Sequence, residues 1–513
     1  MLDYEIRQMY EDMEIRLIKS MKRNLQLHLD EEDETGFKYP QWQAIKLKEL
    51  KRYQRQNKDI VGHDTKGFST SISKYLKNEL KEGSYNALQD YKEAMGDKYK
   101  ANKRLSNSFF RINDRKVNTL IKTVNNDLKT ANRAVLRMTN DQYRKVIFQS
   151  QFYVANGVMT PKQAIDAANK DFLRRGLNVI EYKDGKRVNI ASYSQMAVRT
   201  AGQRAMLMGE GAFRKKMKQH LIQISSHGTS CELCIPWQGK VLIDDVYSGG
   251  SRKDGNYPLV SEAMDQGLFH PNCRHGISTY FGGKDDVSDI DASYENGKDG
   301  SESDAAYQED MNYINRKIRE YTRLEAGSLD ENNVATYKKK KEQWIKVKPI
   351  ERINIMDAAL LHKKIREYEK SIVGLEKENA FLINKHGGVL NFTGSSYEVD
   401  IPAWYDASDA IVIHNHPAKE THYSLSDRDV LFFLNRDLKE LRGIDNEYVY
   451  YVRKNKKIKY TLNDIKEDIT NFRLEAYELS DKGKLDIDKD EYDYINRKLS
   501  KKYGFTYSRR KRR

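Results

Sequence analysis

Two histidines stand directly after an apolar run toward the C-terminal end of the chain. Residues 410–413 are Ala-Ile-Val-Ile, and His414-Asn415-His416-Pro417 follows. Alternate residues of a β-strand point to the same side, so the imidazoles of His414 and His416 can reach one metal ion. Pro417 lacks the amide hydrogen that a strand needs and ends the strand there. This pattern predicts a zinc site with His414 and His416 as two of its ligands.

A carboxylate beyond the following loop can supply a third ligand. A serine at a helix N-cap with an aspartate in the first turn would bring that carboxylate back toward the metal. Two such pairs overlap in the sequence, Ser424 with Asp427 and Ser426 with Asp429. The loop length favours Asp427, whereas the apolar residues after Asp429 favour Asp429. We expect Asp427 to be the ligand and keep Asp429 as the alternative.

Two histidines, one aspartate and a water molecule form a zinc site of the open, catalytic type. Such a zinc ion lowers the pKa of its bound water to about 7, and a nearby carboxylate can then take the proton. Glu378 is the expected base because it precedes the apolar run at residues 380–383, and Glu376 is the alternative. Ser424 is the candidate for stabilising the oxyanion that develops on the substrate carbonyl.

The three cysteines of the chain form a second constellation. Cys231 and Cys234 make a C-x-x-C pair, and Cys273 follows His270 by three residues. Two thiolates in a tight turn and a second pair from a later loop can complete one tetrahedral zinc site, which would be structural. His275 competes with His270 for the fourth position. The alternative is a redox-active C-x-x-C, which would need neither His270 nor Cys273.

Composition indicates a polar chain of several domains. Of its 513 residues, 38% are hydrophobic and 32% are charged, and the net charge of +15 favours nucleic acid as a partner. Residues 508–513 are dense in Arg and Lys and predict a disordered basic tail. Three cysteines in a short region argue against a disulfide framework and fit a reducing compartment. Residues 1–22 are charged throughout and no apolar run reaches 18 residues, so we expect neither a secretory signal nor a transmembrane helix.

Periodicity and composition predict a multidomain protein with a mainly α N-terminal region, a small zinc-knuckle α+β module and an α/β domain. In the first region Thr160-Pro161 marks a helix start, and a hairpin is expected over residues 179–190. Strands of the α/β domain are expected over residues 380–390, 410–414, 448–453 and 458–462. The expected segments are 1–218 (helical), 219–283 (Cys/His module), 284–350 (linker and charged helix), 351–470 (α/β domain) and 471–513 (charged helix and basic tail).

The Cys/His module resembles a known family. The motifs at residues 226–228, 237–241, 257–259 and 267–275 occur in the same order as in the type 2 minor capsid proteins of tailed phages, which are related to head-morphogenesis proteins. The resemblance implies a virion protein inside the head near the portal, made in the host cytoplasm, with a role in assembly and in DNA packaging or ejection. It implies portal and capsid proteins as partners, with phage DNA contacted through the basic surface and tail, and no membrane partner.

Residues 356–465 resemble the JAMM/MPN-plus metalloproteases, and His-Asn-His-Pro is similar to the RadC-like members. The resemblance implies that His414, His416 and Asp427 bind catalytic Zn²⁺, that Glu378 is the general base and that Ser424 assists the oxyanion. The implied activity is hydrolysis of an amide or isopeptide bond in a peptide or protein substrate. Related domains can keep the fold without activity, so a purely structural capsid protein is the alternative, and a toxin-like effector delivered with the particle is another.

Overall fold

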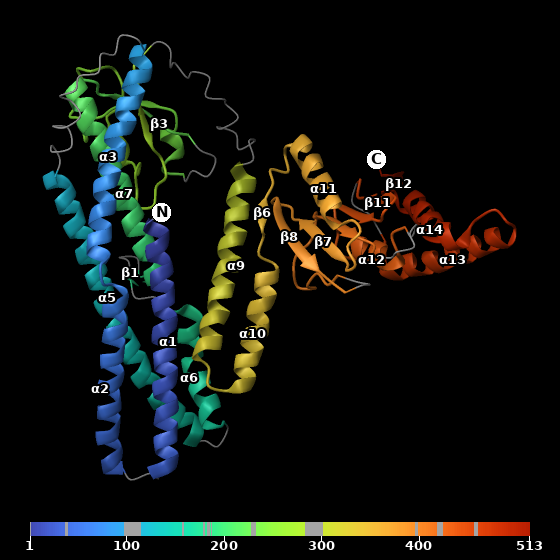
Figure 1. Cartoon of the computed structure of the whole chain (residues 1–513), viewed down its shortest axis with the longest axis horizontal. Helices are drawn as coiled ribbons and strands as arrows, with labels where there is room; N and C mark the ends of the chain where they lie inside the picture. The colour runs from blue at the N-terminus through green and yellow to red at the C-terminus, as the bar shows by residue number, and fades with distance from the viewer. Residues whose placement is uncertain are drawn as a thin grey trace. The chain divides into compact units, whose positions relative to one another are not determined.

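The computed structural model describes residues 2–35, 39–96, 114–155, 159–177, 180–181, 185, 187–226, 232–282, 301–395, 399–417, 424–455 and 460–512. The chain divides into two compact units, and Figure 1 shows their elements. Unit 1 comprises Met1–Asn296 and Arg319–Lys339, and unit 2 comprises Gly297–Ile318 and Lys340–Arg513. The helices α9 (Ser301–Gly327) and α10 (Glu331–Lys346) contribute residues to both units.

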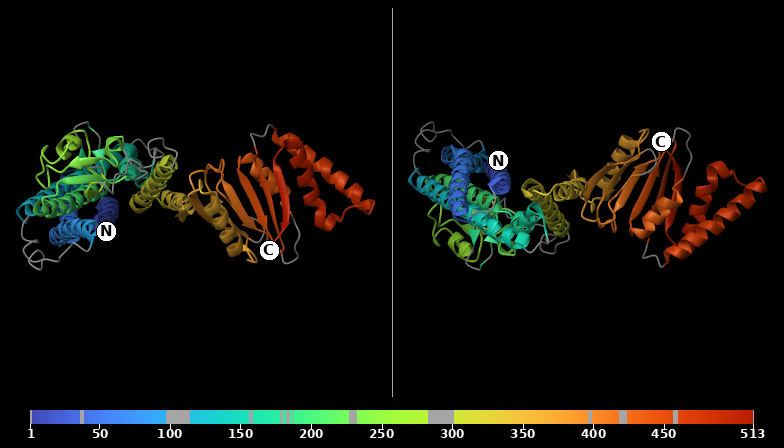
Figure 2. Two further views of the ribbon diagram at one scale, coloured as in Figure 1. Left: turned by 90° about the horizontal axis from the view of Figure 1, so that it is seen from above. Right: turned by 90° about the horizontal axis from the view of Figure 1, so that it is seen from below.

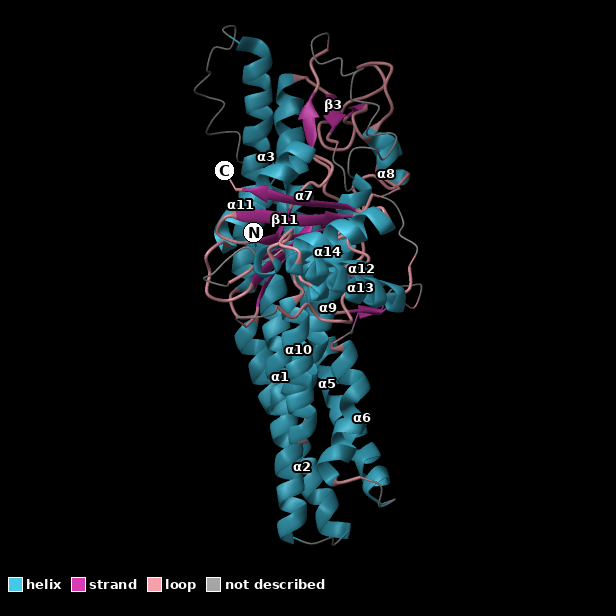
Figure 3. Ribbon diagram, turned by 90° about the vertical axis from the view of Figure 1, so that its right-hand side faces the viewer, coloured by secondary structure: helices cyan, strands magenta, loops and turns pink. Residues whose placement is uncertain are grey.

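Unit 1 consists mainly of long amphipathic helices around an apolar core (Figure 3). Apolar side chains recur at three- and four-residue intervals along the first helix, at Ile6, Tyr10, Met13 and Leu17, and all four are fully buried. The helices are α1 (Leu2–Thr35), α2 (Tyr39–Asp64), α3 (Phe68–Met95), α5 (Asp114–Ala155), α6 (Pro161–Arg175) and α7 (Ile190–Met217). This arrangement confirms the prediction of a mainly helical N-terminal region.

Glycines allow α3 and α7 to cross with their backbones in contact. A Cβ atom on Gly209 would lie 2.0 Å from the carbonyl oxygen of Leu80, and one on Gly83 would lie 2.1 Å from that of Met206. The Ser84 hydroxyl donates a hydrogen bond of 3.0 Å to the carbonyl oxygen of Gly209 across the same crossing. Both glycines are therefore required by close helix packing and not by backbone conformation.

The Cys/His module follows α7 within unit 1. Its three-stranded antiparallel sheet has the order β4 (Val241–Ile243), β3 (Leu221–Ile224) and β5 (Ile277–Thr279), and it also contains the short helices η3 (Ile235–Trp237) and α8 (Val260–Asp265). A small apolar core, including Ile222, Leu242 and Val260, packs on Leu207 of α7. The module is thus joined to the helical region by packing as well as by sequence.

A buried charged group ties α7 to the loop after β4. The Arg214 guanidinium lies 3.1 Å from the carboxylate of Asp244 and 3.3 Å from that of Glu210, and all three side chains are buried. Burial raises the pKa of Glu210 to about 7, since Arg214 only partly offsets it and the carboxylates of Asp90 and Asp244 add to it. The pairing satisfies charges that would otherwise be costly to bury.

Unit 2 is built on a seven-stranded sheet. Its order is β12 (Thr506–Lys511), β11 (Tyr448–Arg453), β10 (Glu440–Ile444), β9 (Ile411–Asn415), β7 (Asn379–Ile383), β8 (Gly388–Thr393) and β6 (Glu351–Arg352). Among the described strands of this sheet, β9 and β10 pair in parallel and all other neighbours are antiparallel. Figure 2 shows these strands side by side.

Helices pack on both faces of this sheet because its inner strands are apolar on both sides. Phe381, Ile383 and Ile413 belong to one core with α11 (Ala358–Ile372). Alternate residues such as Leu382 and Val412 belong to a second core with residues of the other helices. These are α12 (Asp427–Asn435), α13 (Leu462–Asp481) and α14 (Ile487–Tyr503). An α/β domain with this three-layer arrangement confirms the expected α/β character of the C-terminal region.

Local predictions had mixed outcomes. The hairpin is confirmed as β1 (Ile180–Glu181) paired with β2 (Arg187–Val188), and the helix start by a capping box between Thr160 and Gln163. The prediction of a strand over residues 458–462 is wrong for the part that the structure describes. Residues 460–461 form no strand, and Leu462 begins α13. The expected boundary at residue 470 falls within α13, and the linker expected after residue 283 lies largely outside the described residues.

The prediction of a disordered basic tail is wrong. Thr506–Lys511 is the edge strand β12, paired with β11 along its whole length. Its arginines lie over tyrosine rings of β11, with the Arg509 guanidinium 4.5 Å from the ring centre of Tyr448. Cation–π contacts and the apolar stems of the arginines thus allow a strongly basic segment to join a sheet. Among the described residues, no helix is long and apolar enough to cross a membrane.

Candidate metal centres

The central strand β9 positions both histidines of the first candidate centre, which we call the histidine centre. His414 pairs with Ala380 of β7 on one side and Gly443 of β10 on the other. His416 lies just beyond the strand, and its amide donates a hydrogen bond of 2.8 Å to the carbonyl oxygen of Ile444. The Nε2 atoms of His414 and His416 are 3.1 Å apart. The predicted convergence of the two imidazoles is therefore present.

The strand neighbour β10 leaves room for the His416 ring. A Cβ atom on Gly443 would lie 2.9 Å from Nε2 of His416 and 2.8 Å from the side chain of Leu425. The Tyr450 ring of β11 stacks beyond, with its centre 6.2 Å from that of His416. Sequence reasoning missed Gly443, although a glycine inside an apolar strand is a signal of close approach by another group.

Asp429 supplies the carboxylate that joins the histidines. Its Oδ1 lies 3.4 Å from Nε2 of His414, while its Oδ2 accepts hydrogen bonds of 2.7 Å from the amide and the hydroxyl of Ser426. One ligand atom from each of His414, His416 and Asp429 lies within 4.8 Å of the other two. The alternative ligand from the sequence is therefore the one that the fold brings to the histidines.

Asp427, the ligand we expected first, points elsewhere. The helix α12 is capped by Ser426 and not by Ser424, so Asp427 is its first residue and Asp429 its third. A third-position side chain folds back toward the N-cap, whereas the Asp427 carboxylate pairs with the Arg473 guanidinium of α13. The local hydrophobic pattern was thus a better guide than the loop length.

Electrostatics place His414 and Asp429 in the protonation states that a metal needs. Burial lowers the pKa of His414 to about 4, although the Asp429 carboxylate raises it in part. Burial raises the pKa of Asp429, but His414, His416 and the Ser426 hydrogen bonds outweigh it, so the net shift is downward. Neutral imidazoles and an ionised carboxylate are the metal-binding forms.

The loop before β7 carries both candidate bases. Glu378 is half-buried and lies two residues before Ala380, the partner of His414, so strand alternation puts it on the histidine face. Glu376 is exposed.

Asn415, which lies between the two histidines, holds the loop before β7 in place. Its Oδ1 accepts a 2.6 Å hydrogen bond from the amide of Asn379, and its Nδ2 donates hydrogen bonds to two carbonyl oxygens of the loop. Sequence reasoning had assigned Asn415 no role.

Ser424, the expected oxyanion helper, is buried and bonded within the protein. Its Oγ lies 2.7 Å from the Tyr507 hydroxyl and accepts a 3.3 Å hydrogen bond from Nδ2 of Asn496. Its contacts therefore come from α14 and β12, which the sequence had separated from the domain.

The second candidate centre, which we call the cysteine centre, lies in the Cys/His module. The Sγ atoms of Cys234 and Cys273 are 3.7 Å apart, and Nδ1 of His275 lies 3.4 Å from Sγ of Cys273. All three side chains are buried. His270 is half-exposed, with Nδ1 2.8 Å from the carbonyl oxygen of Pro271, so His275 takes the place that we first gave to His270. Cys231 lies outside the described residues.

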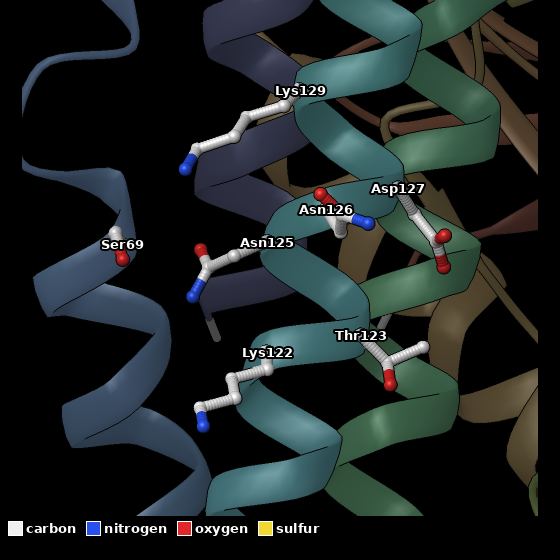
Figure 4. Close-up of a pocket in the computed structure, with 7 residues that line it drawn as sticks. All are labelled: Ser69, Lys122, Thr123, Asn125, Asn126, Asp127 and Lys129. Atoms are coloured by element: carbon white, nitrogen blue, oxygen red, sulfur yellow. The ribbon is translucent and has the colours of Figure 1, made fainter.

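A polar cavity of about 510 Å³ between α3 and α5 is separate from both centres (Figure 4). It is lined by Ser69, Lys122, Thr123, Asn125, Asn126, Asp127 and Lys129. Among the described residues, this lining holds one carboxylate and neither histidine nor cysteine.

Comparison with known proteins places the first two thirds of the chain. The family described as phage minor capsid protein 2 matches residues 2–348. The chain belongs to this family. A "structural protein" of Lactococcus phage LL-H is 25% identical over 251 residues, a match that covers 48% of this chain and 60% of that protein. No solved structure matches.

The minor capsid family assignment confirms the resemblance that we noted in the Cys/His module. It makes the chain a structural protein of the phage virion. The family match ends at residue 348, just before β6. The cysteine centre therefore lies within the minor capsid segment, and the histidine centre lies beyond it.

Proposed function

We propose that unit 2 of this phage structural protein is a zinc-dependent hydrolase of the JAMM type that cleaves an amide or isopeptide bond. The observation that carries the proposal is the convergence of His414, His416 and Asp429 within 4.8 Å at the end of a central strand. His414 is buried, whereas His416 and Asp429 are partly exposed. Three protein ligands with access from one side suit a zinc ion that keeps a position for water or substrate.

Residues around the ligands would carry the proton transfers. Bound zinc would activate a water molecule and polarise the substrate carbonyl. Glu378 would accept a proton as the water oxygen attacks the carbonyl carbon, and would return it to the leaving nitrogen as the C–N bond breaks. The products are a carboxylate and an amine. We do not give Ser424 the oxyanion role, because Tyr507 and Asn496 already engage its hydroxyl.

The cysteine centre would hold a second, structural zinc ion. Its sulfur and imidazole groups suit zinc, and their burial leaves no position for substrate. We propose Cys234, Cys273 and His275 as ligands, with Cys231 as the fourth from the same C-x-x-C pair. A redox C-x-x-C would make no use of the contact between Cys273 and His275.

The proposal is tested on the full-length chain by metal analysis and peptidase assay. We expect two zinc ions per chain, one of which is lost in His416→Ala and the other in Cys273→Ser. Cleavage of peptide and isopeptide panels should disappear with His416→Ala and fall strongly with Glu378→Gln. Zinc binding without any cleavage would contradict the hydrolase activity and would support the alternative, a structural capsid protein with an inactive fold. No zinc at the histidine centre would refute the hydrolase.

The family favours portal and capsid proteins as neighbours in the head, and proteins of the virion as substrates. The effector alternative makes a different prediction. Expression of the full chain in the host would inhibit growth, and His416→Ala would abolish the inhibition. Equal growth with both proteins would argue against an effector.

Contact with phage DNA is a second candidate function, supported by the sheet face around Tyr451. The guanidinium groups of Arg442, Arg453 and Arg510 lie 5.4, 5.3 and 5.7 Å from the centre of this one ring. Arg442 is buried and pairs with Glu369 and Glu440, and Arg453 also pairs with Glu440, so Arg510, exposed on the edge strand, is the guanidinium best placed to meet a phosphate. Such a surface can contact phosphates, and its affinity would then fall steeply with salt.

The DNA contact is tested by measuring the affinity of the full chain for duplex DNA over a range of salt concentrations. Arg510→Gln should reduce the slope of log K against log salt by about 1. Arg187→Gln, an exposed arginine in β2 of unit 1, serves as the control and should leave it unchanged. Equal slopes in all three proteins would contradict the assignment.

A further inference from the structure

We infer that the C-terminal segment α13–α14–β12 positions Asp429 in the histidine centre by holding the short stretch Ser424–Asp427 from three sides. The inference rests on the proposed function, because it concerns the third ligand of the same metal. Sequence patterns had separated residues 471–513 from the domain. The contacts of Arg473, Asn496 and Tyr507 instead make this segment part of the site's support.

The first contact fixes the Ser424 hydroxyl. The Tyr507 hydroxyl donates a hydrogen bond of 2.6 Å to the carboxylate of Asp493, which also pairs with Arg497 at 2.7 Å. Because the single hydrogen of the Tyr507 hydroxyl is used in the hydrogen bond to Asp493, Ser424 must be the donor in the 2.7 Å contact between the two hydroxyls. Asn496 in turn donates to Ser424. The Ser424 hydroxyl thus donates one hydrogen bond, to Tyr507, and accepts another, from Asn496.

The second contact fixes the backbone one residue further on. Nδ2 of Asn496 donates a hydrogen bond of 2.8 Å to the carbonyl oxygen of Leu425. The Leu425 side chain is buried and lies over Gly443, next to the His416 ring. Asn496 therefore holds the backbone of a residue whose side chain lies, with the His416 ring, in the space over Gly443.

The third contact fixes the start of α12. The Arg473 guanidinium of α13 pairs with Asp427, the first residue of that helix, and with Glu491 of α14 at 2.6 Å. Asp429 is two residues further along the same helical turn. Its Oδ1 can face the histidines only while this turn keeps its place against β9.

These contacts should affect the zinc affinity of the histidine centre, because a metal binds tightly only when its ligands are already held in the binding geometry. Loss of a hydrogen bond made directly to a metal ligand typically costs 10- to 100-fold in affinity or activity, so contacts one step further out should cost no more than the lower end of that range. Ser424, Asn496 and Tyr507 touch no ligand atom of the cluster and so act as positioning residues. Their variants should weaken zinc binding at the histidine centre without affecting the cysteine centre.

The test compares two hydroxyl deletions in the full-length chain. Tyr507→Phe removes the hydroxyl that contacts Ser424 and Asp493. Tyr503→Phe is the matched control, because the Tyr503 hydroxyl of the same segment donates its hydrogen bond to Asp468 of α13 and so lies outside the hydrogen-bond chain that reaches Ser424. Zinc affinity of each centre is measured by chelator competition, and cobalt spectra distinguish thiolate ligands from a histidine–carboxylate set. Ser424→Ala is a second, smaller change in the same hydrogen-bond chain.

We expect Tyr507→Phe and Ser424→Ala each to weaken zinc at the histidine centre about tenfold, with Tyr503→Phe within twofold of wild type. The cysteine centre should be unchanged in all three. If Tyr507→Phe unfolds unit 2, the result for Ser424→Ala decides. Wild-type affinity in Ser424→Ala, or equal losses in both tyrosine variants, would overturn the positioning role alone. A wild-type chain that binds no zinc at the histidine centre would overturn the proposed function and this inference with it.

Discussion

The cysteine centre buries all three of its candidate ligands, whereas the histidine centre buries His414 and leaves His416 and Asp429 partly exposed. The two also differ in how they are assembled. Cys234, Cys273 and His275 lie within one small module with its own apolar core. The histidine centre draws its ligands from a strand and a helix, and its support from segments up to the last strand of the chain.

On the proposal that both centres bind zinc, the comparison separates two uses of metal ligands in one protein. A closed site among buried sulfur atoms stabilises the module around it, and an open site on a rigid sheet leaves a position for chemistry. It also shows how choices between nearby ligands are made. In both centres the histidine or aspartate expected second is the one that the fold brings in, because backbone geometry decides between neighbours in sequence.

The largest difference between the two centres should be the effect of metal removal on the free energy of unfolding. With chelator, or in Cys273→Ser, we expect unit 1 to lose several kcal/mol, because a structural zinc contributes directly to folding. In His416→Ala, the free energy of unfolding of unit 2 should change little, because the sheet and its two cores remain. Calorimetry of the full chain with and without chelator measures both. A larger loss of stability in unit 2 than in unit 1 would contradict the assignment of the structural zinc to the cysteine centre.

The choice of carboxylate gives the next largest effect. Asp429→Asn should abolish tight zinc binding at the histidine centre, because it removes the negative ligand oxygen. Asp427→Asn should keep a full complement of zinc with affinity lowered about tenfold or less, since it weakens only the contact with Arg473. Zinc titration of the two variants checks this, and loss of the metal in Asp427→Asn instead would contradict the assignment.

Unit 1 should also respond to pH through Glu210 of α7. Its pKa is about 7 in the folded chain against an ordinary value of 4.5, so the folded state holds more protons between these values. Stability should therefore fall as the pH rises from about 4.5 to about 7, by up to about 3 kcal/mol at about 1.4 kcal/mol per pKa unit.

Glu210→Gln serves as the control for this pH effect, because its side chain has no proton to lose. Denaturant unfolding of unit 1 at pH 5 and pH 8 should show a smaller difference in the variant than in the wild type. The same slope in both proteins would mean that other groups dominate.

The smallest effect concerns the space beside His416. Gly443→Ala places a methyl group where the His416 ring now lies, so the ring must move and its Nε2 leaves the position that faces Asp429. We expect zinc affinity at the histidine centre to fall about tenfold, a cost of about 1.4 kcal/mol. The cysteine centre is the internal control. Unchanged affinity would show that the ring has another way to reach the metal.

Much of the histidine centre could be predicted from short-range patterns. Strand alternation placed His414 and His416 on one side, and the apolar run before them marked the central strand. The choice of Asp429 needed the register of the helix cap. Ser424 and Ser426 are both good caps in sequence, and only the packing of α12 on the sheet selects Ser426.

The parts that could not be predicted depend on distant contacts. Nothing in the sequence around Ser508 or Arg510 indicates a strand, since the β-forming interaction is with tyrosines some 60 residues earlier. For the same reason, the contacts of Tyr507 and Asn496 with Ser424 were missed. In the cysteine centre, His270 and His275 flank Cys273, three residues before it and two after it, and only the folded module shows that His275 is the one buried beside the thiols.

The most direct test of the central claim is a crystal structure of the full-length chain grown with zinc, with anomalous data collected at the zinc absorption edge. We predict two peaks, one of them bonded at about 2.0–2.2 Å to His414, His416 and Asp429. A zinc ion bonded to Asp427 in place of Asp429, or no zinc peak beside the two histidines, would contradict it.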